Sequence, residues 1–425
     1  MTVVAKQAPA PIRPATRGRA KAPSGGRWVF GRRASLWVSA GVVGHTLWTS
    51  AAPALTYRLY AQEWHLSHTA TAGIFAIYPI GVVVMLVGFG GVSDQIGRRG
   101  AMLAGVAASL VGALLFAVAP LMWWLFAGRA LMGIGVGLSV APSTAAIVEF
   151  ISPERAKRAA SVTMLAQAAG FTIALLLGGA LTQYGPWPMH LCFWVLAAFL
   201  VILLIGTWFL PVHGAYGAGH EGLSRMPSVP KEARGAFAAS STAMMAAYTY
   251  GVLALSLGGQ VEQDLIGSPS PFLNGAVLAL FPVAVAIAGI VSGSLPPRVA
   301  LVVGCLVSVL GMVLLMLAVG LRDLPIYLLA TIAAGGAYSL LFVGGLQMIS
   351  AAAPVRHRAG TLSGLYLLGY LSMGTLALLL GAIATARGLG LAVDLGAAAI
   401  IFMNLATLVL AARNLLSDFR ANYDL

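Results

Sequence analysis

The residues best suited to chemistry in this sequence form a short polar cluster between two long apolar runs. Gly90, Asp94, Gly97, Arg98 and Arg99 combine one carboxylate with two guanidinium groups. The two glycines permit a tight turn and a close approach of neighbouring helices. The carboxylate suits the positive end of a helix, and the arginines suit carboxylates or exposed helix carbonyls. The cluster therefore predicts a turn that fixes the orientation of the helices it joins.

A second polar element ends a later apolar run. Glu149 is followed by Pro153 and Arg155. Carboxylate and guanidinium groups form strong, charge-assisted hydrogen bonds. We therefore expect Glu149 to pair with Arg98 or Arg99.

Arg129 lies a little over one turn inside an apolar run and is followed by Gly133, Gly135 and Gly137. Closely spaced glycines let helices pack tightly. Placing an arginine at this depth in a bilayer costs free energy unless the side chain is paired with another group or is reached by water. Two interpretations stay open: a role in a transport pathway, or a side chain that snorkels to the surface.

His45 lies nine residues into the first apolar run, about 14 Å deep at 1.5 Å per residue. Trp48 and Thr49 follow at helical spacing, so the three side chains share a face. Imidazole exchanges a proton near neutral pH. His45 is therefore a candidate for proton coupling or ligand binding, and a histidine hydrogen-bonded within the bundle is the alternative.

Further polar residues occur in the middle of the apolar runs. They are Gln167, Tyr248, Tyr250, Gln347, Tyr366, Tyr370 and Asn404. As a set they predict a moderately polar, aromatic cavity, because tyrosine both stacks on a ligand and hydrogen-bonds to it. The acids Glu63, Glu262, Asp264, Asp323 and Asp394 all fall near run ends. The coupling ion, proton or none, therefore stays open.

Composition assigns these runs to a membrane. The chain has 425 residues, of which 59% are hydrophobic and 9% charged, against about a quarter charged in soluble domains. Twelve segments have the roughly 20 apolar residues that a spanning helix needs. They are about 36–57, 70–92, 101–119, 121–147, 159–182, 189–211, 236–259, 272–295, 299–320, 324–353, 360–385 and 395–412. The predicted fold class is an all-α membrane protein with twelve transmembrane helices in two pseudo-symmetric six-helix bundles.

The cationic residues predict the orientation. With the N-terminus inside, all but four of the 25 Lys and Arg residues fall on cytoplasmic segments; the exceptions are Arg58, Arg129, Arg322 and Arg387. This asymmetry places both termini in the cytoplasm of a multi-pass inner-membrane protein. Loop charge also explains the formal charge of +13, and no nucleic-acid-binding motif is present.

The organisation follows from the longest loop, a Gly- and Pro-containing basic linker. We expect a disordered basic tail at 1–34, a six-helix bundle at 35–211, the linker at 212–235, a second bundle at 236–413 and a C-terminal tail at 414–425. The halves look duplicated, since Pro153 and Pro354 close equivalent spans, and parallel repeats are common in secondary transporters.

The cluster Gly90, Asp94, Gly97, Arg98 and Arg99 resembles the loop signature of the major facilitator superfamily, with a glutamine at position 95 in place of the usual cation. Arg129 with its glycines, and the element from Glu149 to Arg155, resemble further patterns of that family. The resemblance implies alternating access, with Gly90, Asp94, Gly97, Arg98, Arg99, Glu149 and Arg155 as a cytoplasmic latch and Arg129 in substrate or proton coupling.

The resemblance to drug antiporters is incomplete, because residues 170–179 keep the glycines of the fifth-span pattern but lack its proline. No lysine follows a glycine, so a phosphate-binding loop is absent. The seven histidines are dispersed, so we expect no enzyme activity, metal or cofactor.

The sequence predicts a monomeric secondary transporter of a small organic molecule in the lipid bilayer, most simply by proton-linked efflux. Proton symport or facilitated uptake of a sugar, organic acid or aromatic compound is the alternative. A membrane sensor or scaffold that transports nothing is a further one.

Overall fold

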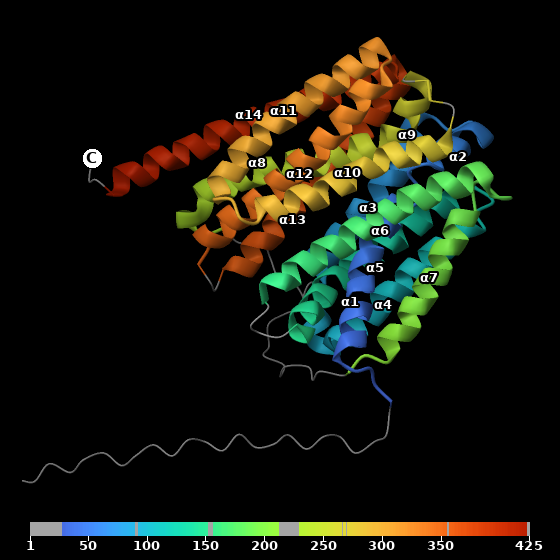
Figure 1. Ribbon diagram of the computed structural model, residues 1–425, viewed down its shortest axis with the longest axis horizontal. Coiled ribbons are helices and arrows are strands. Elements are labelled where there is room, and N and C mark those ends of the chain that lie inside the picture. Colours follow the sequence, from blue (N-terminus) through green and yellow to red (C-terminus); the bar gives the residue numbers. More distant parts are fainter. Residues whose placement is uncertain are drawn as a thin grey trace, which may run out of the picture.

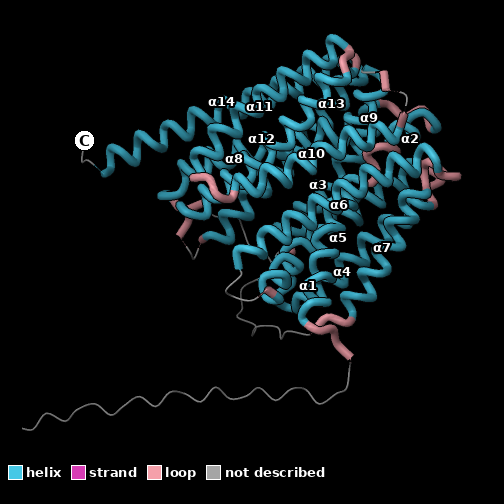
Figure 2. Tube along the Cα trace, viewed as in Figure 1, coloured by secondary structure: helices cyan, strands magenta, loops and turns pink. Residues whose placement is uncertain are grey.

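The computed structural model describes residues 28–89, 92–151, 156–211, 229–265, 267–268, 270–354 and 357–422. Throughout these ranges the backbone forms helices, turns and loops without β-strands (Figure 2). Apolar runs of this length form helices in lipid because only a helix satisfies every backbone polar group within one segment. The predicted all-α class is therefore confirmed.

Two sets of helices follow one another along the chain. The first set, here called the N half, contains α1 (Arg32–Ala51), α2 (Tyr57–Glu63), α3 (His68–Gly88), α4 (Val92–Ala117), α5 (Met122–Phe150), α6 (Ala156–Tyr184) and α7 (Leu191–Trp208). The second set, the C half, contains η2 (Lys231–Ala233), α8 (Arg234–Gly251), η3 (Val252–Leu257), α9 (Gly258–Gln260), η4 (Val261–Leu265), α10 (Pro271–Ser292), α11 (Pro297–Leu321), α12 (Leu324–Ala352), α13 (Arg358–Arg387) and α14 (Leu389–Asn422).

Ten helices of the described chain are long and apolar enough to cross a membrane. They correspond to all the predicted spans except the first and the seventh. The first span is α1, and the seventh is a composite of α8, η3, α9 and η4, in which η3 and η4 are π-helical. The twelve expected segments are thus all helical, and two of them are less regular or less apolar than the rest.

The helices pack mainly within their own half. In Figure 1, α1 to α7 form one bundle and α8 to α14 form another, and the bundles meet along two helix pairs. These pairs are α3 with α13 and α6 with α10. We call the end that carries α1's start and α14's end the terminus face, and the opposite end the distal face.

Side-chain caps fix where several helices begin at the distal face. Ser67 accepts a hydrogen bond from the Ala70 amide at the start of α3. Asp323 does the same for Ile326 at the start of α12, over 2.8 Å. Such caps satisfy amide groups that have no partner within the helix. The distal loops are therefore held close to the bundle.

Glycines in the N half allow backbones to touch. A Cβ atom on Gly135 would lie 2.5 Å from the carbonyl oxygen of Gly105, and one on Gly133 would lie 2.3 Å from that of Tyr78. Both distances are too short for carbon. The glycines that follow Arg129 therefore serve close packing of α5 against α4 and α3, as their spacing predicts.

The expected tails and linker are described only in part. Residues 1–27 and 212–228 lie outside the described residues. Helix α1 begins at Arg32, inside the expected tail, and the preceding Trp28 packs its ring 5.6 Å from that of Phe209. Helix α14 continues to Asn422, so part of the expected C-terminal tail is helical.

Candidate transport site

Five half-buried aromatic side chains of the C half form one group, here called the aromatic cluster. Its members are Tyr248 of α8, Tyr338 and Phe342 of α12, and Tyr366 and Tyr370 of α13. The rings of Tyr248 and Tyr370 lie 4.7 Å apart, edge to face, and those of Tyr338 and Phe342 stack at 5.7 Å. Phe342 joins the two pairs, at 6.4 Å from Tyr248 and 6.3 Å from Tyr366.

Helical spacing builds this cluster. Tyr338 and Phe342 are four residues apart on α12, and Tyr366 and Tyr370 are four apart on α13, so each pair shares a face. Tyr248, Tyr366 and Tyr370 are predicted from the sequence, whereas Tyr338 and Phe342 are not, although the same spacing marks them. Ring faces and hydroxyl groups together suit aromatic or cationic organic molecules.

The N half places Tyr78 of α3 near the aromatic cluster. Tyr78 is within electrostatic reach of Tyr338 and Tyr370. The guanidinium group of Arg129 lies over the Tyr78 ring, with its Cζ atom 4.5 Å from the ring centroid. The cluster therefore lies near an aromatic ring of the N half that is supported by a buried cation.

Arg129 is fully buried and is bound within the N half. Its Nη1 donates to the carbonyl oxygens of Thr49 at 3.3 Å and Ser50 at 3.2 Å. These carbonyls lie at the end of α1, where Pro53 supplies no amide to continue the helix. The alternative in which Arg129 snorkels to the surface does not fit this burial. The arginine instead caps a helix end, where a cation is favoured.

His45 and Trp48 also face the N-half interior. His45 is fully buried; its Nδ1 contacts the carbonyl oxygen of Val42 and its Nε2 lies 3.3 Å from Ser109 Oγ. Trp48 stacks on Phe199 at 4.8 Å. The shared face predicted for these residues is present, and it points into the bundle rather than towards the aromatic cluster.

A buried hydrogen-bond chain occupies the C half. Tyr250 Oη lies 2.5 Å from Ser308 Oγ, and Asn404 Nδ2 donates to the same Ser308 over 2.6 Å. Tyr250 and Asn404 are both predicted from the sequence as site residues. They are joined through Ser308, which is not predicted. Of the remaining candidates, Gln167 and Gln347 are half-buried on α6 and α12.

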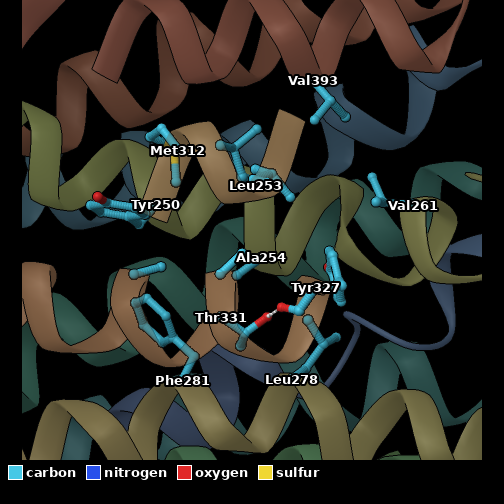
Figure 3. Close-up of a pocket in the computed structure, with 13 residues that line it drawn as sticks. Tyr250, Leu253, Ala254, Val261, Leu278, Phe281, Met312, Tyr327, Thr331 and Val393 are labelled. Carbon is cyan, nitrogen blue, oxygen red and sulfur yellow. Dashed lines mark hydrogen bonds between the residues drawn. The ribbon is translucent and has the colours of Figure 1, made fainter. Parts of the chain in front are cut away.

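A cavity lies inside the C half, beside the hydrogen-bonded residues Tyr250, Ser308 and Asn404 (Figure 3). It contains about 480 Å³ not filled by atoms, including the part that opens outward. Most of its lining is aliphatic or aromatic, and its hydroxyl groups belong to Tyr250, Tyr327 and Thr331. Thr331 donates to the Tyr327 carbonyl oxygen over 2.9 Å, so this hydroxyl is already used.

Polar contacts join the two halves at the distal face. Arg58 pairs with Asp264 at 2.8 Å. The hydroxyls of Thr69 and Thr385 lie 2.9 Å apart. Gln183 accepts from Ser270, over 2.6 Å.

We call this set of contacts the distal gate. Further hydrogen bonds between the halves at this end join His68 with Gln260, Thr69 with Gly381, and Gln183 with the Phe272 amide. Exposed ion pairs contribute about 1 kcal/mol or less, so these contacts are individually weak enough to separate.

The polar loop at the terminus face is held within the N half. Arg98 forms the expected ion pair with Glu149, at 2.5 Å. Arg99 lies 5.4 Å above the Trp208 ring and donates to the Leu210 carbonyl oxygen. These contacts orient α4, α5 and α7 relative to one another.

The rest of the predicted latch is only partly described. Gly97 breaks α4 with φ 76° and ψ 156°, a backbone conformation that suits glycine. Gly90 and Arg155 lie outside the described residues, as does the side chain of Asp94.

Comparison with known proteins identifies the family. A family model described as Major Facilitator Superfamily matches residues 37–378. The chain belongs to the major facilitator superfamily. It is therefore a multi-pass membrane protein, and the resemblance inferred from its loop motifs is confirmed.

Of two curated relatives of this superfamily member, one is named for multidrug efflux and the other for multidrug resistance. Multidrug efflux pump LfrA of Mycolicibacterium smegmatis is 30% identical over 131 residues, which are 30% of this chain and 26% of LfrA. Multidrug resistance protein MdtH of Yersinia pestis is 32% identical over 127 residues, 29% of this chain and 31% of MdtH. The matched segment thus spans about a quarter to a third of the relatives' length.

Solved structures show the same fold over most of the chain. The nucleoside transporter NupG has a TM-score of 0.72 at 13% identity, covering 89% of this chain and 100% of that one. A bacterial homologue of the human lysosomal transporter Spinster has a TM-score of 0.65 at 15% identity, covering 90% and 95%. At these identities the likeness establishes the major facilitator fold alone.

Proposed function

We propose that this transporter exports small aromatic or cationic organic molecules by proton-linked alternating access. The aromatic cluster carries this proposal. Its five rings are half-buried and come from three helices, so a ligand between the halves has stacking partners on several sides. No member carries a formal charge. Recognition would therefore depend on ring faces and hydroxyl groups, which accept varied aromatic structures.

The weakly joined distal gate supports alternating access. In this state the halves are linked at the distal face, so the route past the aromatic cluster would be closed there. Separation of Arg58 from Asp264 and of Thr69 from Thr385 would open it. The latch predicted at the terminus face would then hold the opposite end together.

The proposed location is the inner membrane, with the terminus face in the cytoplasm and the distal face in the periplasm. The bias of Lys and Arg towards segments at the terminus face supports this orientation. The name of LfrA, a multidrug efflux pump, supports efflux as the direction of transport.

Flux in proteoliposomes tests the proposal. We would load purified protein into vesicles, clamp the membrane potential with potassium and valinomycin, and follow ethidium, a planar aromatic cation. Proton antiport predicts that an acidic lumen drives ethidium inward, because protons leave as the dye enters. A protonophore should abolish this uptake, and protein-free vesicles should show none.

Two results would contradict this proposal. Uptake driven only by acid outside the vesicles would indicate proton symport. Saturable flux of other compounds in the panel, with no response to the pH gradient, would indicate facilitated transport. The panel would therefore include an uncharged aromatic compound, a sugar and an organic acid.

A further inference from the structure

The composite seventh span ends in an irregular segment at the distal face. After α8, the backbone forms the π-helical turns η3 and η4 on either side of the short α9. The segment contains Gly251, Gly258 and Gly259, which lower the cost of such turns. π-Helical turns widen a helix locally and are frequent at functional sites.

Glu262 lies in this segment between two contacts of the distal gate. Two residues before it, Gln260 bonds through Oε1 to the Nδ1 atom of His68 in the N half. Two residues after it, Asp264 pairs with Arg58, also in the N half. Any separation of the halves at this end therefore moves the backbone on both sides of Glu262.

The Glu262 side chain is sealed from solvent. Its exposed fraction is 0%, and neither carboxylate oxygen has a hydrogen-bond partner. Tyr327 of α12 is within electrostatic reach, and Val261 and Tyr327 both line the C-half cavity. The carboxyl group thus occupies an apolar corner between that cavity and the gate.

A carboxyl group in such a corner is held as the neutral acid. An ionised carboxylate needs a cation or several hydrogen-bond donors to offset the loss of water, and the described surroundings supply neither. Burial of the neutral acid costs less free energy, because only its hydrogen bonds to water are lost. Closure of the distal gate is therefore compatible with a protonated Glu262 and opposed by an ionised one.

We propose that Glu262 is a proton-binding group that makes opening of the distal gate depend on the proton concentration at the distal side. With the gate closed, Glu262 holds a proton. When the contacts of Gln260 and Asp264 with the N half separate, water reaches the carboxyl group, which releases its proton to the distal side as H⁺. Closure then requires a proton to be taken up again from that side.

This assignment rests on the proposed alternating access and adds the group through which pH at the distal side acts on the gate. At this end of the molecule, the elements around Glu262 carry further titratable or charged groups. They are Tyr57, Arg58, Tyr60 and Glu63 of α2, His68 of α3, Asp264 of η4, Asp323 at the N-cap of α12, Tyr327 of α12 and Asp394 of α14. His68 and Asp264 belong to the gate contacts on either side of Glu262. Any test must separate Glu262 from His68 and Asp264.

Distance measurement between spin labels tests the proposal without requiring transport. Labels at Leu121→Cys in the N half and Leu321→Cys in the C half would report on the distal face, because both side chains are exposed there. The background would be Cys192→Ala with Cys305→Ala. Full-length protein in lipid nanodiscs would be frozen at pH 5 to 8 and studied by double electron–electron resonance.

The ratio of open to closed gate should rise about tenfold from pH 5 to pH 8, because the closed gate binds the proton more tightly than the open one. Glu262→Gln should keep the gate closed and reduce this change to less than about twofold, since glutamine stays neutral. Glu262→Asp retains a carboxyl group and should retain the response.

Two control variants decide whether the response belongs to Glu262. Asp264→Asn should open the gate more at every pH, because it removes the ion pair with Arg58, and should still respond to pH. His68→Gln should also still respond. If either control variant abolishes the response while Glu262→Gln keeps it, the assignment is wrong. A pH-independent gate in the parent protein would also overturn it.

The outcomes separate this inference from the proposed function. Proton-driven flux together with a gate that still responds to pH in Glu262→Gln would remove Glu262 and leave proton-linked transport standing. If the pH response of the gate depends on Glu262 but flux does not respond to the pH gradient, the role of Glu262 at the gate stands and proton-linked transport is contradicted. Monodisperse elution of each variant establishes that it is folded.

Discussion

The two halves of the molecule place their polar groups differently. In the N half, Arg129 is bound to the end of α1 and His45 is bound to its own helix and to Ser109. In the C half, the aromatic cluster is half-buried and Glu262 has no partner. From this comparison we infer a structural role for Arg129 and His45 in the N half, and we place the proposed ligand recognition and proton binding in the C half.

Replacing Arg129 tests the N half most severely. In Arg129→Ala, the carbonyls of Thr49 and Ser50 lose their donor and Tyr78 loses its cation. We expect at least about 3 kcal/mol of lost stability and a loss of transport of more than about tenfold. Thermal unfolding in detergent and flux would measure both. An Arg129→Ala protein as stable and active as the parent would contradict the structural role of Arg129.

Crowding a helix contact should have the next largest effect. Gly135→Ala forces a methyl group against Gly105 and should destabilise the protein by about 1–3 kcal/mol. Gly336→Ala on α12 is the matched control, because a Cβ atom there meets nothing within 4 Å. Its unfolding temperature should be unchanged or slightly higher. Equal losses from the two changes would contradict the close packing of α5 against α4 at Gly135.

Removing one ring tests the aromatic cluster. Tyr370→Ala removes the ring that lies edge to face against Tyr248 and should raise the KM for an aromatic substrate about tenfold, as expected for about 1.4 kcal/mol. Tyr370→Phe keeps the ring and should change KM less than about threefold. If the phenylalanine variant is as impaired as the alanine variant, the hydroxyl rather than the ring binds substrate.

The smallest effect is expected at His45. Both ring nitrogens are used within the N half, so His45→Gln should leave the pH dependence of flux unchanged and cost about 1 kcal/mol of stability. Flux measured from pH 5 to 8 would check this. A shifted or flattened pH profile would return His45 to the proton pathway and contradict the division between the halves.

Much of the fold follows from the sequence alone. The apolar runs predict the helices, because lipid leaves the backbone no other partner. Charge and loop position also predict that Glu149 pairs with Arg98 or Arg99, and the structure shows Arg98 as the partner. Each of these predictions depends only on the sequence of one or two segments.

The site is less predictable because it depends on which face each helix turns inward. His45 and Trp48 share a face as expected, but only the packing of α4 and α7 reveals that this face is internal. Glu262 lies beyond its predicted span and suggests a solvated end. Its burial arises from π-helical turns and from contacts with α12, α14 and the other half, for which the sequence carries no local signal.

The most direct test of the account is a reversible cross-link across the distal gate. Thr69 and Thr385 face each other with their hydroxyl oxygens 2.9 Å apart, so cysteines at both positions are close enough to form a disulfide. Both single-cysteine variants serve as controls. If the halves separate here in every cycle, oxidation should abolish proteoliposome flux and a reducing agent should restore it. Undiminished flux through fully cross-linked protein would contradict the account.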